Sequence, residues 1–487
     1  MDTYTLKENK ASLPSIIQGG MGIGVSNWEL ARAVSQRGGL GVVSGSALDT
    51  VLIRRLQDGD LGGHMRRALE AYPNPATSAA ILERWFQPEG RRSGQNYRVK
   101  ALPTFGMDRD LIELMIVGSF VEVYLAKEGH SGWVGFNILE KTQVQSLPAL
   151  LGAMLAGVDA VLMGGGIPLS IPAVLDNFAQ MLPAELKVHV LEAGADDDFR
   201  TELNPQDFLP DQSALKRPLF FPVISSEILA KTLLKKGSGR IDGFVIEKPN
   251  AGGHNAPPRR GGEYGPKDQC NVESIRKLGL PFWLAGGEAS PGHIKEAQEA
   301  GAQGIQAGSI FALSKESGIE DGLKLTLIES YFAGNLDVIT DFKASPTGYP
   351  LKRAEYGSEL SPESCRVCDL GYLRQPFMRG SGTLGYRCPA APLAGFVRKG
   401  GAPEEAEGKQ CLCNGLLATV GLGRLNFDGQ EEAPLVTIGQ DLTFLHRVLP
   451  EGKRTYSVED VFEYLLGSLE TGSAIVKSPE TQELQAC

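Results

Sequence analysis

Glycine-rich turns and one histidine follow a set of short apolar runs late in the chain. Residues 251–254 (Ala-Gly-Gly-His) follow the apolar run at 244–246. Residues 284–287 (Leu-Ala-Gly-Gly) and 306–309 (Gln-Ala-Gly-Ser) each complete a similar run. Glycine lets backbone amides approach a phosphate closely, and a histidine at the same edge can hold or release a proton near neutral pH. The pattern predicts a phosphate-binding site with His254 as its catalytic residue.

A second group of reactive side chains lies in the C-terminal third, where most of the cysteines are concentrated. The candidate metal ligands there are Cys365, Cys368, Cys388, Cys411 and Cys413. In a reducing compartment such clustering is more typical of metal ligands than of disulfides. Four thiolates satisfy tetrahedral zinc or an iron–sulfur cluster. The spacing leaves zinc, an iron–sulfur cluster and buried thiols without metal as alternatives.

These motifs need a scaffold that brings several strand ends together. Short apolar runs alternate with amphipathic helical patterns, for example at 28–37 and 109–127. Eight runs read as barrel strands, at 15–18, 40–43, 133–138, 160–163, 219–224, 244–246, 281–284 and 304–305. This alternation predicts an α/β fold, and the number of strands favours a closed (β/α)8 TIM barrel over an open sheet. In such a barrel, phosphate sites form after strands seven and eight.

The alternation of strands and helices along the chain predicts its domain organisation. We expect a (β/α)8 barrel domain over residues 12–335 that binds the phosphate group, with an insertion at about 184–217 and a strand at 187–192. Residues 336–487 form a C-terminal extension rich in glycine and cysteine. Because that extension has little periodicity from which to build a core, we expect a metal to contribute to its stability.

Composition excludes several classes of partner. The chain has 487 residues, 42% of them hydrophobic, and a net charge of −10. That charge argues against nucleic acid and anionic membrane surfaces. No apolar run reaches the roughly 18–20 residues that span a bilayer, and residues 1–10 lack the apolar core of a secretion signal. We therefore expect a cytoplasmic protein that acts on a small molecule, with its oligomeric state left open.

Taken together and in order, the motifs resemble the nitronate monooxygenase (2-nitropropane dioxygenase-like) family. These are FMN-dependent (β/α)8 enzymes related to the FMN-dependent enoyl-acyl-carrier-protein reductases. The resemblance covers about residues 12–355 and includes 17–22 (Ile-Gln-Gly-Gly-Met-Gly) and 38–41 (Gly-Gly-Leu-Gly). It implies that His254 is the active-site histidine. It places around FMN the residues Met21, Gly22, Asn137, Glu247, Gly252, Gly287, Gln306, Ala307, Gly308 and Ser309.

The resemblance implies a flavoprotein oxidoreductase of the monooxygenase type. Such an enzyme oxidises nitronates or nitroalkanes with O2 to a carbonyl compound and nitrite. Glu247 departs from the pattern, because the family usually has glutamine there, and the insertion and extension also lie outside it. Two alternatives stay open. One is an NAD(P)H-dependent enoyl-thioester reductase on the same barrel, and the other is a non-catalytic flavin- or metal-binding assembly protein.

Overall fold

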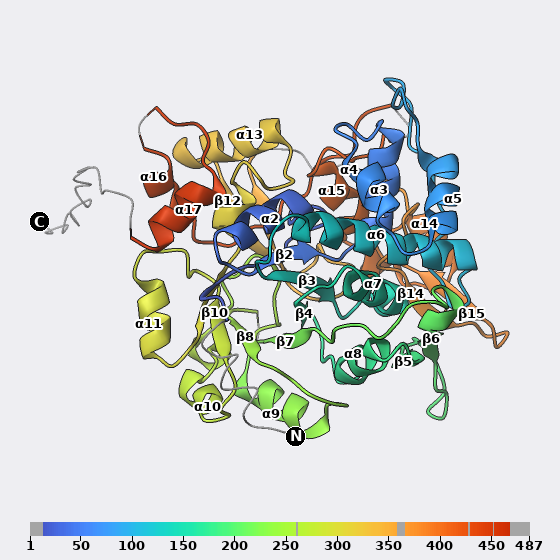
Figure 1. Cartoon of the computed structure of the whole chain (residues 1–487), viewed down its shortest axis with the longest axis horizontal. Coiled ribbons are helices and arrows are strands. Elements are labelled where there is room, and N and C mark those ends of the chain that lie inside the picture. Colours follow the sequence, from blue (N-terminus) through green and yellow to red (C-terminus); the bar gives the residue numbers. More distant parts are fainter. Residues whose placement is uncertain (1–12, 260–261, 358–365, 427–428, 451, 468–487) are drawn as a thin grey trace, which may run out of the picture.

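The computed structural model describes residues 13–259, 262–357, 366–426, 429–450 and 452–467. Its central strands are β1 (Ile16–Gln18), β2 (Gly41–Ser44), β3 (Val134–Leu139), β4 (Ala160–Gly164), β7 (Leu219–Ile224), β8 (Phe244–Glu247), β10 (Phe282–Ala285) and β11 (Gly304–Ala307). They form one parallel sheet of order β1-β11-β10-β8-β7-β4-β3-β2. The two end strands meet where Ile17 pairs with Leu40. The predicted (β/α)8 TIM barrel is confirmed (Figure 1).

Side chains alternate between the inside and the outside of the barrel, as the pleat of a strand requires. The inward set is one buried cluster that includes Ile17, Val42, Leu162, Phe221, Val245 and Trp283. Their sequence neighbours on the same strands point outward into the larger core under the helices. The Trp283 Nε1–H donates to the Pro14 carbonyl at 2.8 Å, at the end of β1 opposite the glycine turns. That end of the barrel is therefore closed by packed side chains, which leaves the other end for a site.

Helices surround the strands, and several begin at caps that are visible in the sequence. The barrel region contains α2 (Trp28–Gln36), α3 (Leu48–Gln57), α4 (His64–Glu70), α5 (Pro75–Trp85), α6 (Arg109–Lys127), α7 (Gln143–Leu155), α8 (Ile171–Ala179), α9 (Glu227–Lys236), α10 (Val272–Arg276), α11 (His293–Glu299), α12 (Ser309–Ala312) and α13 (Asp321–Phe332). Asn27 begins α2, because its side-chain oxygen accepts from the Leu30 amide at 2.9 Å. Asp108 caps α6 in the same way, through the Leu111 amide at 2.8 Å. Such caps satisfy amides that have no partner in the first turn of a helix.

The insertion forms a hairpin beside the barrel. Its strands are β5 (Ala184–Lys187) and β6 (Arg200–Leu203), which pair antiparallel. The strand predicted at 187–192 is wrong in its position, because β5 ends at Lys187. Beyond it Leu191 forms a single bridge with Phe377 of the extension. Between these two points, the Val188 amide donates to the Phe199 carbonyl of the hairpin at 2.8 Å, and the His189 amide donates to Gln143 Oε1 at 2.9 Å.

The extension is folded and contacts the barrel on several sides. It contains β12 (Asp337–Asp341), β13 (Leu351–Glu355), β14 (Gln375–Met378), β15 (Leu384–Arg387), α14 (Leu393–Arg398), α15 (Leu412–Ala418), α16 (Leu445–Val448) and α17 (Val458–Leu465). Strand β13 pairs with β12 and with β9 (Gly253–His254), which belongs to the barrel region. Residues such as Leu417 and Phe462 share one buried core with the barrel helices. Although its sequence has little periodicity, the extension therefore contains helices and strands that pack into the core of the barrel.

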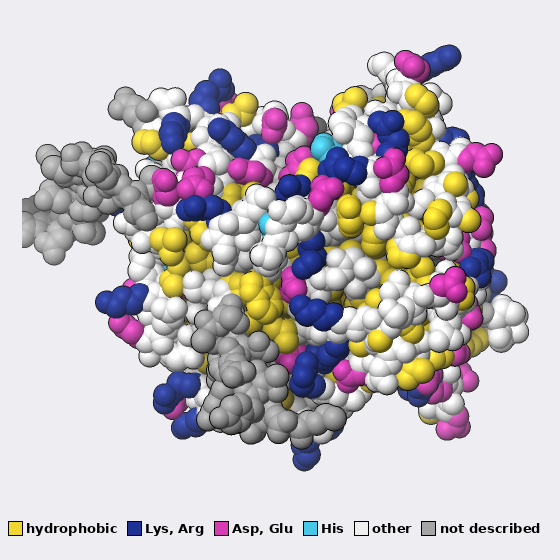
Figure 2. Space-filling view, in the orientation of Figure 1, with side chains coloured by type: hydrophobic (Ala, Val, Ile, Leu, Met, Phe, Trp, Pro, Cys, Tyr) yellow, Lys and Arg dark blue, Asp and Glu magenta, His cyan; other side chains and the backbone are white. Residues whose placement is uncertain are grey.

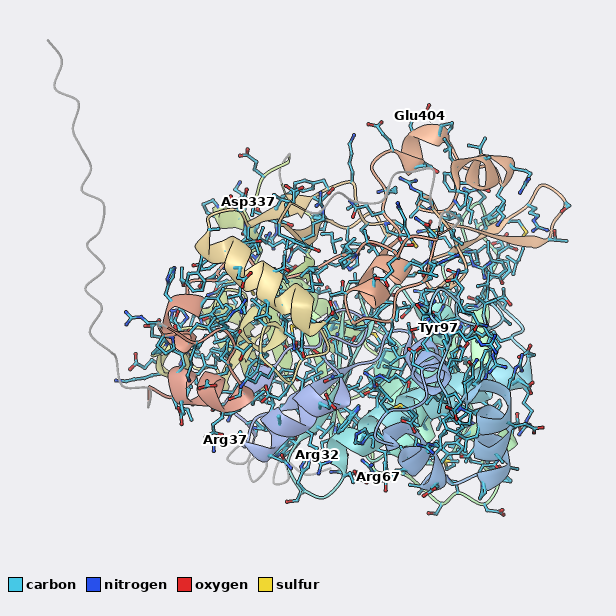
Figure 3. The ribbon with its side chains drawn as sticks, turned by 90° about the horizontal axis from the view of Figure 1, so that it is seen from above. Arg32, Arg37, Arg67, Tyr97, Asp337 and Glu404 are labelled. Atoms are coloured by element: carbon cyan, nitrogen blue, oxygen red, sulfur yellow. The ribbon has the colours of Figure 1, made fainter. Side chains whose placement is uncertain are left out.

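Ion pairs join the outer helices of the barrel to one another and to the extension. Arg37, at the end of α2, pairs with Glu459 of α17 at 2.9 Å. Arg32 and Arg67 lie close together in Figure 3 and both pair with Glu128, at 3.5 and 2.9 Å.

Figure 2 shows acidic and basic side chains interspersed over the visible face. None of the helices in the described ranges is both long and apolar enough to cross a bilayer.

Candidate active site

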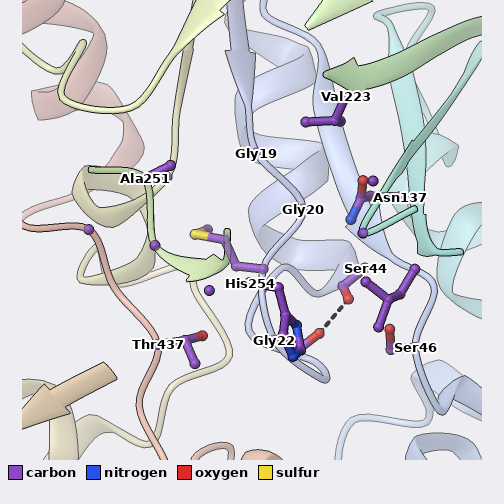
Figure 4. A pocket seen from close by; sticks show the side chains of 18 of the residues that line it. Gly19, Gly20, Gly22, Ser44, Ser46, Asn137, Val223, Ala251, His254 and Thr437 are labelled. Carbon is purple, nitrogen blue, oxygen red and sulfur yellow. Dashed lines mark hydrogen bonds between the residues drawn. The ribbon is translucent and has the colours of Figure 1, made fainter. Parts of the chain in front are cut away.

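The carboxyl ends of the barrel strands enclose one cavity of about 270 Å³. That is nearly twice the roughly 150 Å³ that admits a benzene molecule, so a larger ring system fits. The turns after β1, β3, β8, β10 and β11 form its floor, and residues 435–444 of the extension cover part of it. Figure 4 shows His254, Asn137 and Gly20 around this space, with Thr437 of the extension opposite. The cavity is thus built jointly by the barrel and the extension.

The structure brings the predicted site residues together. His254 and all ten predicted cofactor residues line this cavity, namely Met21, Gly22, Asn137, Glu247, Gly252, Gly287, Gln306, Ala307, Gly308 and Ser309. They come together because the carboxyl ends of parallel strands share one edge of the barrel. Their contact with FMN stays a prediction, whereas their common location is observed.

The turn after β10 is open to backbone contact only because its residues are glycines. Gly286 and Gly287 have φ of +95° and +71°. A Cβ atom at Gly287 would lie 2.4 Å from Asn250 Nδ2, and one at Gly286 would lie 2.7 Å from Asn250 Oδ1. Both the left-handed conformation and the close approach therefore require glycine. The result is a turn without side chains facing the cavity, which suits an anionic group.

The turn after β11 contacts the extension directly. Ser309 Oγ accepts a hydrogen bond from the Gly439 amide at 2.7 Å. A Cβ atom at Gly252 would lie 2.6 Å from the carbonyl carbon of Ile438, so the turn after β8 is also in tight contact with this segment. Because a hydroxyl both accepts and donates, Ser309 keeps its O–H for a ligand. The extension thereby positions the second predicted phosphate turn.

Three side-chain amides at the cavity have a buried oxygen without a hydrogen-bond partner among the described residues. They belong to Gln145 of α7, Asn250 after β8 and Gln306 of β11. A buried carbonyl left without a donor costs about 1–3 kcal/mol. A ligand with N–H and O–H donors would satisfy these oxygens, and a flavin with a ribityl chain carries such donors. The donor and acceptor chemistry of the cavity therefore fits FMN.

Asn137 lies in β3, two residues before the strand ends, directly against the turn that follows β1. A Cβ atom at Gly20 would lie 2.3 Å from Asn137 Cβ, which no structure tolerates. Gly20 thus lets the β1 turn pass close to Asn137. Gln18 also holds this turn in place. Its Oε1 accepts from the Val42 amide at 2.9 Å, and its Nε2 donates to Ser26 Oγ at 2.8 Å.

Burial favours the protonated form of Glu247. Burial raises the pKa of its carboxyl group to about 8, and the charge of Lys352 opposes this rise. Burial in turn lowers the pKa of Lys352 to about 8, against the charge of Glu247. The Lys352 Nζ donates to Thr340 Oγ1 at 2.7 Å. A neutral carboxylic acid both donates and accepts a hydrogen bond, so the protonated Glu247 offers both to a ligand.

His254 is a neutral imidazole held by a chain of hydroxyl groups. Its Nε2 lies 2.7 Å from Ser345 Oγ, which lies 2.8 Å from Thr347 Oγ1. Burial lowers the pKa of His254 to about 4. Because the ideal pKa of a general base lies near the working pH, His254 is better suited to orient a substrate by hydrogen bonding than to remove a tightly held proton.

A buried polar network joins the roof of the cavity to the barrel helices. The Tyr372 hydroxyl of the extension donates to Asp49 Oδ1 at 2.5 Å and lies 2.5 Å from Thr50 Oγ1. Lys100 pairs with the same Asp49 at 2.9 Å, and both side chains are buried. Since Tyr372 also lines the cavity, this network fixes one wall of the site to α3.

Four of the candidate metal ligands meet elsewhere in the extension. Cys368, Cys388, Cys411 and Cys413 are free thiols that line a second, much smaller cavity. Burial raises the pKa of Cys388 and Cys413 to about 12. Cys365 lies outside the described residues. Within those ranges, no three His, Cys, Asp or Glu side chains are grouped so that they could hold a metal ion. The predicted zinc or iron–sulfur cluster is therefore not shown.

Sequence reasoning missed the polar residues that lie outside the glycine motifs. Gln145, Asn250, Lys352, Ser345 and Tyr372 come from a helix, a turn and the extension. Asn250 immediately precedes the Ala-Gly-Gly-His motif, which is a signal that could have identified it. The others depend on contacts between segments far apart in the chain, which local spacing does not reveal.

Comparisons with known proteins give similarity at the level of solved structures only. No protein-family model matches the chain, and no curated protein matches it either. FabK from Thermotoga maritima is 15% identical with a TM-score of 0.47, over 96% of this chain and 95% of that one. A nitroalkane oxidase from Streptomyces ansochromogenes is 14% identical with a TM-score of 0.45, over 94% and 95%. The enoyl reductase domain of MlnA from Bacillus amyloliquefaciens is 13% identical with a TM-score of 0.37, over 73% and 66%. Similarities of this size carry no argument about the reaction.

Proposed function

We propose that this chain is an FMN-dependent oxidoreductase. The observation that carries the proposal is the single cavity in which the glycine turns after β8, β10 and β11 meet three unpartnered amide oxygens. The amides of Gly287 and Gly308 and the hydroxyl of Ser309 would hold the phosphate. Asn137, Glu247 and Gln306 would contact the polar edge of the ring, with Met21 and Gly22 against its face. FMN would supply the two-electron chemistry, and the protein would supply binding and orientation.

For the reaction itself, we propose nitronate oxidation with O2, the chemistry of the resembled family. A nitronate is already deprotonated, so its oxidation requires no strong base in the protein. A neutral imidazole at His254, held by Ser345, can then donate a hydrogen bond to the anionic substrate. Apolar residues of the roof, such as Leu412, Leu416 and Leu435, would contact the carbon chain of the substrate and exclude water.

One observation favours the alternative, NAD(P)H-dependent reduction of an enoyl thioester. That reaction requires a proton at the α-carbon of the substrate. Glu247 lines the cavity and holds a proton below about pH 8, so its carboxyl group can deliver one. Nitronate oxidation has no use for such an acid. The third possibility, a protein that binds flavin without catalysis, leaves both Glu247 and the His254–Ser345 contact without a role.

A spectrum and two assays test the proposal. We expect the purified protein to be yellow and to release FMN, rather than FAD, on denaturation. Oxygen uptake with a primary or secondary alkyl nitronate supports nitronate oxidation, whereas NAD(P)H oxidation with an enoyl thioester assigns the reductase reaction. A colourless protein that cannot be reconstituted with FMN would contradict the cofactor assignment. A flavoprotein inactive in both assays would contradict both reactions.

A further inference from the structure

A group of three titratable side chains lies beside the glycine turn that follows β10. Glu288 comes directly after Gly287 of that turn, lines the large cavity and is only 6% exposed. The ammonium group of Lys248, the residue after β8, donates to Glu288 Oε1. His293 Nδ1, at the start of α11, lies 3.6 Å from Glu288 Oε2. A buried carboxylate at the turn therefore meets two basic side chains.

Lys248 is fixed close to this turn by its backbone as well as by its side chain. Its amide donates to the Ala285 carbonyl at 2.9 Å, and a Cβ atom at Gly286 would lie 3.0 Å from Lys248 Cβ. The side chain thus starts beside the turn and ends on the carboxylate that follows it. An ammonium group has three N–H donors, so the bond to Glu288 does not exhaust them.

The two basic partners of Glu288 are not equivalent. Lys248 is within hydrogen-bond distance of the carboxylate and carries a compact positive charge. An imidazole forms an ion pair with a carboxylate only when it is protonated, and His293 Nδ1 is buried without a hydrogen-bond partner among the described residues. Lys248 is therefore the group that compensates the charge of Glu288 when His293 is neutral.

Without compensation, the Glu288 carboxylate would repel an anionic ligand at the same turn. Like charges repel more strongly in a partly buried site than in water. We propose that Lys248 is a positioning residue for the cofactor phosphate, because its compensation of Glu288 lets the turn after β10 accept a phosphate monoester. This inference rests on the proposed function, since it takes the FMN phosphate to bind the amide of Gly287.

Riboflavin provides the comparison that tests this inference, because it has the ring and ribityl chain of FMN but no phosphate. Fluorescence quenching at low ionic strength measures the affinity of the full chain, freed of flavin, for each ligand. We expect Lys248→Met to weaken FMN binding at least about tenfold and to change riboflavin binding less than about threefold. Glu288→Gln should tighten FMN binding at least about threefold, because Lys248 is then free to balance the phosphate.

The double variant, Lys248→Met with Glu288→Gln, separates charge compensation from a structural role. It removes both charges, so FMN binding should return to within about threefold of wild type. Lys277→Met is the matched control. Lys277 also pairs with a glutamate, Glu273 at 3.7 Å, and neither residue lines the cavity, so both flavin affinities should stay at the wild-type value.

The outcomes distinguish this inference from the proposed function. Equal loss of FMN and riboflavin binding in Lys248→Met, or no recovery in the double variant, would overturn the inference and leave FMN as the proposed cofactor. A wild-type chain that binds neither flavin would overturn the proposed function and this inference with it. Should Lys248→Met fail to fold, Glu288→Gln decides, because unchanged or weaker FMN binding in that variant would contradict the role of Lys248.

Discussion

Gln145, Asn250 and Gln306 each bury an amide oxygen that no described residue satisfies. A buried oxygen that stays without a donor costs about 1–3 kcal/mol, so a partner for each of the three is favourable. A ligand that donates to them recovers this free energy and stabilises the protein by mass action. At the scale of single residues, the site is therefore built for an occupant with several N–H or O–H donors.

His254 gives a first prediction at this scale. Replacing it by asparagine should leave flavin bound but lower turnover roughly tenfold, because the substrate loses one orienting hydrogen bond worth about 1–1.5 kcal/mol. The loss should be similar for a nitronate and for a neutral substrate, since the imidazole removes no proton. Since the pKa of His254 is lowered to about 4, its ionisation should not appear in the pH–rate profile above pH 5.

Steady-state kinetics with the three substrates measures this effect. His189→Asn is a suitable control, because His189 is exposed and lies outside the cavity. Turnover of the neutral substrates within threefold of wild type would remove His254 from the mechanism.

Glu247 predicts a dependence of stability on pH. Its folded pKa, about 8, lies above its ordinary value of 4.5, so the folded state binds the proton more tightly than the unfolded state does. The resulting contribution to the free energy of unfolding is complete below pH 4.5 and is lost as the pH rises through 8. Glu247→Gln keeps the shape but removes the titration, so its stability should decline less between pH 5 and 8.

Urea unfolding of the flavin-loaded protein across this range checks the prediction. Glu83→Gln, at an exposed position, controls for loss of one carboxylate. If the free energy of unfolding changed with pH in the same way for wild type and Glu247→Gln, the prediction would be contradicted.

At the scale of elements, the ends of the strands determine how closely the turns pack. A Cβ atom at Gly20 would lie 2.3 Å from Asn137 Cβ, whereas one at Gly19 would meet only the flexible Gln306 side chain at 3.4 Å. We expect Gly20→Ala to separate the β1 turn from β3 and to weaken FMN binding at least roughly tenfold, or about 1.4 kcal/mol. Gly19→Ala should change it far less. Quenching of flavin fluorescence on titration compares the two, and equal affinities would contradict this account.

The strands were predictable because their pattern is local. Val42-Val43 and Phe244-Val245-Ile246 are buried on both faces, so each reads as a continuous apolar run that ends in a turn. Parallel strands in a barrel place those turns at one edge, so His254 and Gly287 could be assigned to one site before any contact was known. The strand expected at 187–192 was misplaced for the same reason, since local alternation does not show which segment is the partner.

At the scale of the whole molecule, the extension was the part that local patterns could not describe. Its glycines and prolines conceal the fact that Tyr372, Leu435 and Phe444 reach the cavity from far along the chain. The unexpected site residues Lys352 and Ser345 belong to the same region. Whether residues 336–487 form a separate domain stays a prediction. The shared core and the network around Asp49 show how closely the two regions are joined.

The pairing of β1 with β11, and the position of residues 435–444 over the cavity, determine when during synthesis the site can form. A ribosome delivers the N-terminus first, so β1 is present long before its partner at 304–307 has been made. The barrel closes only after that strand emerges, and the cavity gains its roof only after Phe444 follows. Until then the glycine turns and the buried amide oxygens are open to water. A cofactor held in this cavity is therefore acquired only after residue 444 has been made.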